Sequence, residues 1–302
     1  MGQNVPKSTV PNGTPFPKGG NQMFYEFMKF IIYSGLIVLI SKYILVKTLR
    51  KLAENLNLKA KTVGDVAGYA TSVPELLTIS TSSLRGLQAA SVYNILSSNI
   101  INFIQYIASV VANKNRRAFE NIAIKIDIIL VILTIAIPIT LMWLNIDINI
   151  KIVPLFILLY ALFVYINNNA HKLYLENEDK ELEKQIQEEE KTEIGNTRKT
   201  VLYIGILIIT GILLFVVGDL LGETLENLAN IFHIPQTIIG ILLGFTTSIP
   251  ELITFFEAQK HYKQQEDNIL GVVEATNNLL TSNILNLFII QVIGVLLYAI
   301  FA

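Results

Sequence analysis

The sequence predicts an all-α integral membrane protein of about eight transmembrane helices, arranged as two repeats of opposite orientation. Three observations carry this prediction. The chain of 302 residues is 52% hydrophobic, and its mean hydropathy of +0.51 is above that of most soluble domains. An eleven-residue segment occurs twice, at 68–78 and 244–254, with seven identical positions. Both copies lie in apolar stretches and contain a proline, which interrupts a helix.

Eight apolar stretches are long enough to cross a hydrocarbon core of about 30 Å. Residues 1–22 are rich in Gly, Pro and Asn and lack an apolar core, so no cleavable signal peptide is expected there. The first apolar stretch is therefore expected to target the chain to the membrane and to remain in it. The predicted helices are 24–46, 63–83, 88–112, 122–144, 151–168, 200–217, 235–258 and 270–300.

The distribution of Lys and Arg predicts the orientation. With the loop 169–199 in the cytoplasm, inside loops carry sixteen Lys and Arg residues and outside segments carry four, as the positive-inside rule requires. The N-terminus is then outside, and the expected location is a prokaryotic plasma membrane. The helix that carries Glu75 runs outward and the helix that carries Glu251 runs inward, so the two repeats are antiparallel.

The repeat extends beyond the eleven-residue segment. At the same offset, residues 47–53 resemble 223–229, with basic residues exchanged for acidic ones, as expected for segments on opposite sides of a membrane. The fourth and fifth helices have no counterpart, so the predicted organisation is five helices plus three. The predicted parts are a polar tail (1–22), a first half (23–168), an acidic cytoplasmic linker (169–199) and a second half (200–302).

Each repeat places oxygen-bearing side chains at membrane depth. A threonine and a serine stand four and three residues before a glutamate, which puts all three on one helix face. The proline lacks an N–H group and so frees the carbonyl oxygen four residues earlier. A polar stripe with the spacing i, i+4, i+8 follows on the next helix. The two sets are Thr71, Ser72, Glu75, Asn94, Ser98 and Asn102, and Thr247, Ser248, Glu251, Asn278, Ser282 and Asn286.

Two buried carboxylates at matched positions predict a bound cation, because each costs roughly 2.5–3.5 kcal/mol in the middle of a membrane. The chain has no cysteine, so its ligands are oxygens, which suit hard cations such as Ca²⁺ and Na⁺. A charge of −2 would be neutralised by one Ca²⁺ or two Na⁺. Paired, interrupted helices in inverted repeats are also typical of transporter binding sites.

Each feature has a simpler alternative. A single Thr-Ser-x-Pro-Glu segment fits a helix cap, and Ser98, Asn102, Ser282 and Asn286 also fit hydrogen bonding between helices. Glu274 has no acidic counterpart in the first repeat and is expected to extend to the cytoplasmic interface.

Thr-Ser-x-Pro-Glu followed by Ser-Asn-Ile-x-Asn, twice and inverted, resembles the α-repeats of the sodium/calcium exchanger family of cation/Ca²⁺ antiporters. The resemblance covers most of the chain from Met23 onward. It implies a secondary active antiporter that exchanges Ca²⁺ for Na⁺, or for H⁺, by alternating access as the first and sixth helices move. The implied Ca²⁺ ligands are Thr71, Glu75, Thr247 and Glu251. The implied Na⁺ ligands are Ser72, Ser98, Ser248, Ser282 and the backbone carbonyls around Gly68 and Gly244.

The resemblance places Asn102 and Asn286 at the central amide or carboxylate positions of the family, and prokaryotic relatives often carry Asp at the second of these. Two further departures stand out. Members of this size usually have about ten helices. Glycines usual in the family are replaced here, which argues against close packing of the polar-striped helices. The replacements are Tyr93, Ser97, Asn277 and Thr281.

Two other classes fit parts of the sequence: a cation channel, and a non-transporting paralogue or half-assembled subunit that still binds cations. The expected partners are the lipid bilayer and Ca²⁺ with Na⁺ or H⁺. The sequence predicts no cofactor, no enzymatic activity and no nucleic-acid partner. An oligomer is compatible with the sequence but is not required.

Overall fold

The computed structural model describes residues 19–56, 58, 60–177, 196–232, 235–264 and 268–301. Most of the predicted polar tail and of the predicted acidic linker therefore lies outside the described residues. Within the described part, the chain is helical and contains no strand. The helices are α1 (Gly19–Ile40), α2 (Val46–Asn55), α3 (Ala60–Thr71), α4 (Val73–Leu84), α5 (Gln88–Ala112), α6 (Ile122–Trp143), α7 (Val153–Asn177), α9 (Thr197–Phe232), α10 (Gln236–Thr247), α11 (Ile249–Gln264), α12 (Asn268–Leu285) and α13 (Gln291–Phe301).

These helices form eight membrane-spanning units. Seven described segments are long and apolar enough to cross a membrane. The eighth unit is α3–α4, which is divided at Ser72 into two helices of 12 residues each. A π-helical turn joins α1 to α2 at Ser41–Leu45, and a second joins α12 to α13 at Asn286–Ile290. The predicted all-α membrane fold with two inverted repeats is confirmed.

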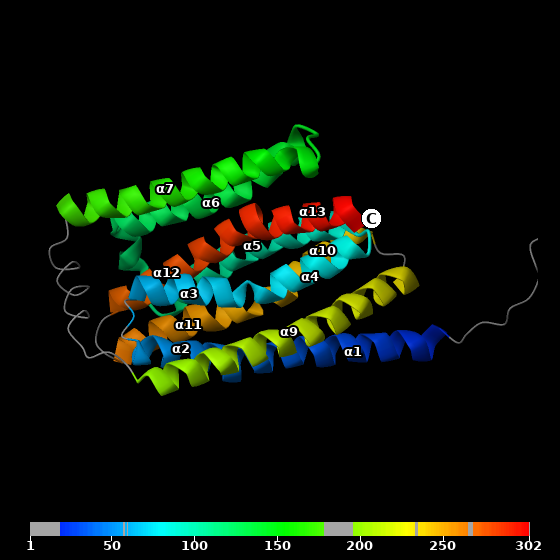
Figure 1. Cartoon of the computed structure of the whole chain (residues 1–302), viewed down its shortest axis with the longest axis horizontal. Coiled ribbons are helices and arrows are strands. Elements are labelled where there is room, and N and C mark those ends of the chain that lie inside the picture. The colour runs from blue at the N-terminus through cyan, green and yellow to red at the C-terminus, as the bar shows by residue number, and fades with distance from the viewer. Residues whose placement is uncertain are drawn as a thin grey trace, which may run out of the picture.

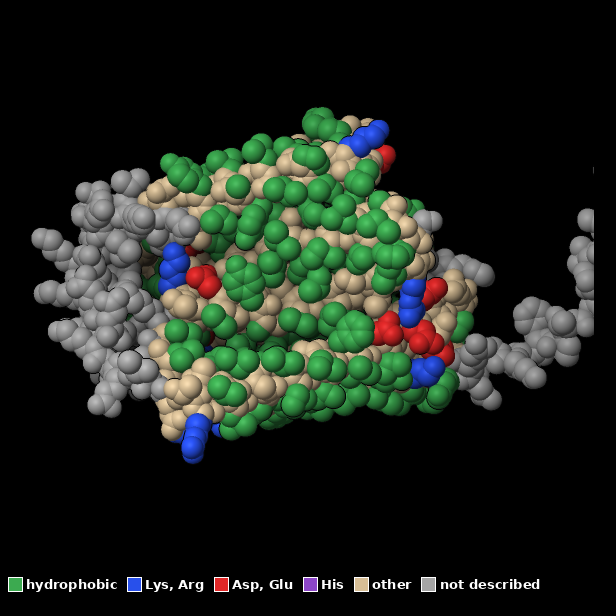
Figure 2. Space-filling model, in the orientation of Figure 1, with side chains coloured by type: hydrophobic (Ala, Val, Ile, Leu, Met, Phe, Trp, Pro, Cys, Tyr) green, Lys and Arg blue, Asp and Glu red, His purple; other side chains and the backbone are tan. Residues whose placement is uncertain are grey.

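The units lie side by side in three groups (Figure 1). Helices α1–α2 and α9 run together along one edge, and α6 and α7 run along the opposite edge. Between them lie α3–α4, α5, α10–α11 and α12–α13, which we call the core units. Figure 2 shows hydrophobic side chains across the middle of one face, with charged side chains gathered toward its two ends. This is the surface expected of a protein that spans a bilayer.

Three membrane units are longer than the sequence predicted. The first continues to Asn55 instead of residue 46, the fifth to Asn177 instead of 168, and the sixth covers 36 residues instead of 18. In each case the helix continues past the apolar stretch into charged sequence. Hydropathy detects only the apolar part of a helix, which lies in the hydrocarbon core, whereas the backbone hydrogen bonds of the helix continue beyond that part. The charge-exchanged segments 47–53 and 223–229 therefore lie on helices.

The buried apolar side chains form two main clusters. The larger joins the core units to α6 and α7 and includes Tyr106, Phe156, Phe255 and Phe288. The second joins α1–α2 to α9 and includes Ile37, Leu49, Leu214 and Leu221, together with Ile239 and Leu243 of α10. The pair α1–α2/α9, which we call the outer pair, thus packs as its own layer against one face of the core units.

Candidate cation site

The site begins at two helix breaks with the same geometry. Ser72 ends α3 and Ser248 ends α10, and both residues have φ of −80° and ψ of 0°. The next helix starts at once, with Pro74 or Pro250 as its second residue. Proline is favoured at this position because its missing N–H would have no helical partner there. The predicted interruption of both helices is confirmed.

The breaks place the two glutamates at helix N-termini. Glu75 lies in the first turn of α4 and Glu251 in the first turn of α11. Both side chains are completely buried. The positive end of a helix dipole stabilises a carboxylate in this position, which offsets part of the cost of burial.

The repeats meet through a reciprocal pair of asparagines. The Asn99 amide donates to the carbonyl oxygen of Asn283, and the Asn283 amide donates to that of Asn99, both at 3.2 Å. These residues occupy equivalent positions in the two repeats, so a pseudo-two-fold axis passes between α5 and α12. The other site residues are arranged around this crossing.

Glycines on the broken helices bring the crossing helices close. A Cβ atom at Gly68 would lie 2.8 Å from Cβ of Thr281, and one at Gly240 would lie 2.8 Å from Cβ of Tyr93. Gly64 and Gly244 are equally confined by α12 and α5. The expectation of loose packing from the replaced family glycines was therefore wrong. Close approach is provided by glycines on the partner helices α3 and α10.

Each glutamate lies beside hydroxyls from both repeats. Glu75 faces Thr247 of the second repeat and Ser98 of its own, while Glu251 faces Thr71 of the first repeat and Ser282 of its own. The two carboxylates are close enough to repel each other. Ser282 Oγ donates to Glu251 Oε1 at 3.1 Å. The two repeats thus build one site jointly.

The serines extend the arrangement on both sides. Ser72 Oγ lies 3.0 Å from Ser282 Oγ, and Ser98 Oγ lies 3.3 Å from Thr247 Oγ1. Ser98 also donates to the carbonyl oxygen of Gly244 at 3.3 Å. The carbonyl oxygens of Gly68 and Gly244 accept the backbone N–H groups of Ser72 and Ser248. The Gly244 oxygen also accepts the hydroxyls of Ser98 and Thr247, so it lies among the hydroxyl oxygens of the site.

The side-chain amides of Asn102 and Asn286 lie next to these serines and to the asparagine pair. Asn102 donates to Ser282 Oγ at 3.4 Å and to Asn283 Oδ1 at 3.3 Å. Asn286 donates to Asn99 Oδ1 at 3.2 Å and stands where the α-helical pattern of α12 changes to a π-helical turn. Such turns are frequent at functional sites. Neither Asn102 Oδ1 nor Asn286 Oδ1 has a hydrogen-bond partner among the described residues, so both amide oxygens are left for another ligand.

Six buried acceptor oxygens in this region have no hydrogen-bond partner among the described residues. They are Glu75 Oε1 and Oε2, Glu251 Oε2, Asn102 Oδ1, Asn286 Oδ1 and Ser248 Oγ. Unsatisfied buried acceptors are rare and call for an explanation. A hard cation is a fitting one, because Ca²⁺ takes six to eight oxygen ligands of these types. No group of three His, Cys, Asp or Glu side chains gathers in the described residues, so the site relies on two carboxylates.

The structure places the twelve predicted cation ligands at the two helix breaks and at the crossing of α5 and α12. These ligands are Gly68, Thr71, Ser72, Glu75, Ser98, Asn102, Gly244, Thr247, Ser248, Glu251, Ser282 and Asn286. The structure also assigns roles that sequence reasoning missed. Asn94 donates to Thr78 Oγ1 at 3.0 Å, and Asn278 donates to the equivalent Thr254, so these stripe residues hold helices together. Their amide oxygens accept the hydroxyls of Ser98 and Thr71. Thr78 and Thr254 end the repeated segment, and their identity in both copies was the signal that could have revealed them.

The expectation for Glu274 was also wrong. Glu274 was expected to extend toward the membrane interface, but its residue is only 3% exposed. Both of its carboxylate oxygens accept hydrogen bonds from Arg50, at 2.7 and 2.8 Å. A partner 224 positions away cannot be found from local spacing.

Comparison with known proteins agrees with this geometry. Solved structures of the sodium-calcium exchanger NCX_Mj have the same fold. The one soaked with 100 mM Na⁺ and 10 mM Sr²⁺ has a TM-score of 0.54 and 21% identity, covering 91% of this chain and 83% of that chain. The one soaked without Na⁺ and Ca²⁺ has a TM-score of 0.52 and 20% identity, with the same coverage. No protein of curated function matches the chain in sequence.

The family assignment comes from a sequence profile. The profile of the sodium/calcium exchanger protein family matches residues 27–168 and 202–301. These two segments include both repeats, both helix breaks and all the residues of the candidate site. The chain belongs to the sodium/calcium exchanger protein family.

Proposed function

We propose that this protein exchanges Ca²⁺ for Na⁺ across a membrane by alternating access, with Ca²⁺ bound between Glu75 and Glu251. The observation that carries the proposal is the set of six unpartnered acceptor oxygens, which converge from both repeats on a region shielded from solvent. Membership of the exchanger family supports the same reading, and the sodium-calcium exchanger NCX_Mj shares the fold.

Each predicted ligand has a role in the proposed site. Glu75, Glu251, Thr71 and Thr247 surround Ca²⁺. Na⁺ binds beside them, at Ser72, Ser98, Ser248, Ser282 and the carbonyl oxygens of Gly68 and Gly244. Asn102 and Asn286 supply neutral amide oxygens between these positions. One Ca²⁺ or two Na⁺ would balance the two carboxylates, so the ions compete for the same charge.

Exchange follows from this competition. An empty site would hold two carboxylates that repel each other at membrane depth, which opposes the occlusion needed for reorientation. The site therefore changes its access only when it is loaded, either with Ca²⁺ or with the coupling cation. Access alternates as the outer pair moves against the core units.

The proposed placement keeps the N-terminus outside and the segment 169–199 in the cytoplasm of a prokaryotic cell. The chain is organised as five helices (23–168) and three helices (200–302), joined by this acidic linker. Besides the transported ions, the surrounding lipid bilayer is the only partner that the proposal requires.

Uptake of ⁴⁵Ca²⁺ into proteoliposomes tests the proposal. We expect uptake when the vesicles contain Na⁺, and none when they contain K⁺ at the same pH. Uptake driven by a pH gradient alone would replace Na⁺ by H⁺ as the coupling ion. Uptake that needs no counter-ion gradient would identify a channel, and its absence under every gradient would favour a non-transporting paralogue.

Isosteric variants test the site. We expect Glu75→Gln and Glu251→Gln to lower Ca²⁺ uptake by about 100-fold, because removing one of two buried countercharges costs roughly 3 kcal/mol and each 1.4 kcal/mol is tenfold. Glu120→Gln is the matched control, since Glu120 is exposed at the end of the short 3-10 helix (Arg116–Glu120) that precedes α6. Wild-type uptake by either site variant would overturn the assignment of these residues.

A further inference from the structure

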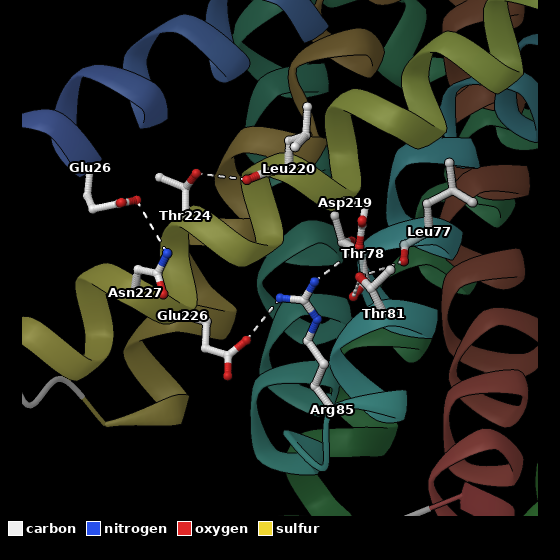
Figure 3. A network of polar contacts seen from close by, with 10 residues as sticks. All are labelled: Glu26, Leu77, Thr78, Thr81, Arg85, Asp219, Leu220, Thr224, Glu226 and Asn227. Carbon is white, nitrogen blue, oxygen red and sulfur yellow. Dashed lines mark hydrogen bonds and ion pairs between the residues drawn. The ribbon is translucent and has the colours of Figure 1, made fainter.

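The outer pair is held together as a unit. Besides its apolar cluster, α2 is joined to α9 at one end by Asn55, which donates to Thr200 Oγ1 at 2.8 Å. At the other end, Asn227 of α9 donates to Glu26 of α1 at 3.5 Å (Figure 3). A movement of either helix along the core units therefore carries the other helix with it.

One buried ion pair fixes this unit to the core at one end. Arg50 lies on α2 and Glu274 on α12, and their two parallel hydrogen bonds form a bidentate pair. The side chains are 16% and 4% exposed. Such a pair requires one geometry, and separating its members would leave charge in a poorly solvated place.

A different arrangement fixes the unit at the opposite end. Arg85, just after α4, donates to Glu226 at 2.9 Å and to Asp219 at 3.3 Å, both on α9 (Figure 3). These side chains are 30–42% exposed. The two acids are seven residues apart, or about 10 Å along a helix. Glu223 lies between them in sequence, on the same helix face.

The two fixations are related by the repeat. Arg50 and Glu226 occupy equivalent positions in the charge-exchanged segments. Each lies on a helix of the outer pair and contacts a core unit, but at opposite ends of the molecule and with opposite charge. Equivalent positions of the two repeats thus hold the cation of one ion pair, Arg50, and the anion of the other, Glu226.

We propose that these ion pairs set the position of the outer pair on the core units. The Arg50–Glu274 pair, which we call the lock, can form in one position only. The cluster of Arg85 with Asp219 and Glu226, which we call the rail, can form in several positions. When the outer pair slides, Arg85 keeps one acid of α9 within reach over about two helical turns. Arg50 has to release Glu274 completely. Opening at the Arg50 end is therefore the more strongly restrained step. The inference rests on the exchange function proposed above, because that function requires the movement.

Thiol labelling tests the lock without measuring transport. The chain has no cysteine, so Val66→Cys introduces a single thiol. Val66 lies on α3 and packs against the cluster of the outer pair, so its reaction with a maleimide reports separation of the two layers. The full-length protein is placed in nanodiscs, where the reagent reaches both faces.

The decisive variant is Arg50→Gln with Glu274→Gln, which removes both charges and leaves neither one buried alone. We expect its labelling rate to rise about fivefold or more, whereas Asp219→Asn with Glu226→Gln changes the rate by about twofold or less, since exposed pairs contribute little. Exchanging the charges, with Arg50→Glu and Glu274→Arg, is expected to return the rate toward that of the wild type. Lys51→Gln removes an exposed neighbouring charge and is the matched control.

A labelling rate of the double-Gln variant equal to that of the wild type would overturn the lock. A larger effect of the Asp219 and Glu226 variant would reverse the proposed roles of the two ends. Failure of the exchange proposal would appear separately, as absence of Ca²⁺ uptake by the wild-type protein in proteoliposomes.

Discussion

The glycines of the core units and those of the outer pair lie in opposite surroundings. At Gly64, Gly68, Gly240 and Gly244, an added Cβ would overlap atoms of the crossing helix. At Gly35 of α1 and at Gly205, Gly211 and Gly218 of α9, such an atom would meet nothing within 4 Å. The same residue type therefore serves close packing in one region and leaves free space in the other. Tight glycine crossings therefore hold the core units together around the site, and these glycines of the outer pair make no such contact.

The polar contacts follow the same division. The core units are joined by buried, reciprocal bonds between backbone and side chain at Asn99 and Asn283. The outer pair is joined to them through ion pairs at its two ends. A buried bond of the first kind has one geometry, as does the bidentate Arg50–Glu274 pair, whereas the more exposed Arg85 shares two acids of α9. Only the Arg85 end is therefore held by contacts that can exchange partners.

The largest predicted effect comes from filling the tight crossing. In Gly240→Ala, the new Cβ would lie 2.5 Å from the carbonyl oxygen of Ala90 and 2.8 Å from Cβ of Tyr93. One neighbour is a backbone oxygen and the other is a Cβ atom, so neither can move without shifting α5. We expect a destabilisation of about 3 kcal/mol or more, measured as a lower unfolding temperature in detergent. An unchanged unfolding temperature would contradict the division into tight and open regions.

A smaller effect is expected at the pseudo-two-fold axis. Asn99→Ala and Asn283→Ala each remove one of two equivalent bonds and leave a buried carbonyl oxygen without its donor. Each also removes an acceptor, that of the Asn286 amide or that of the Asn102 amide. Each is expected to cost roughly 1–3 kcal/mol. Because the two bonds have the same length, the two variants should shift the unfolding temperature by similar amounts. Strongly unequal shifts would show that the repeats are not energetically equivalent at their crossing.

The smallest effect is expected in the outer pair. Gly211→Ala meets no neighbouring atom, and alanine is favoured over glycine in a helix by about 0.5–1 kcal/mol. The unfolding temperature should stay the same or rise slightly. A marked decrease would mean that α9 is packed as tightly as α10.

Much of the fold and the site could be predicted because the signals are local and repeated. Hydropathy locates the membrane units, prolines at 74 and 250 locate the breaks, and helical spacing gathers the polar side chains. The repeat itself shows which residues belong together. These signals nominated the hydroxyl, amide and carboxylate side chains of the proposed site, whereas the carbonyl oxygens of Gly68 and Gly244 were nominated by the resemblance to the exchanger family.

The parts that sequence reasoning missed depend on distant residues or on helix outside lipid. The pairing of Arg50 with Glu274 requires the packing of α2 on α12, and no spacing rule connects them. The length of α9 was underestimated because its second half is amphipathic rather than apolar. The packing glycines were sought on α5 and α12, whereas the structure has them on α3 and α10.

The proposed exchange requires the outer pair to move while the core units hold the ions, and a reversible crosslink tests this most directly. A Cβ at Gly222 of α9 would lie 3.6 Å from Thr81 Oγ1 of α4, so side chains at these two positions are in contact and cysteines there are candidates for an oxidative crosslink. Gly222→Cys with Thr81→Cys adds two thiols to a chain that has none. After oxidation we predict that ⁴⁵Ca²⁺ uptake stops while equilibrium Ca²⁺ binding persists, and that a reductant restores uptake. Undiminished uptake by the fully crosslinked protein would contradict the account.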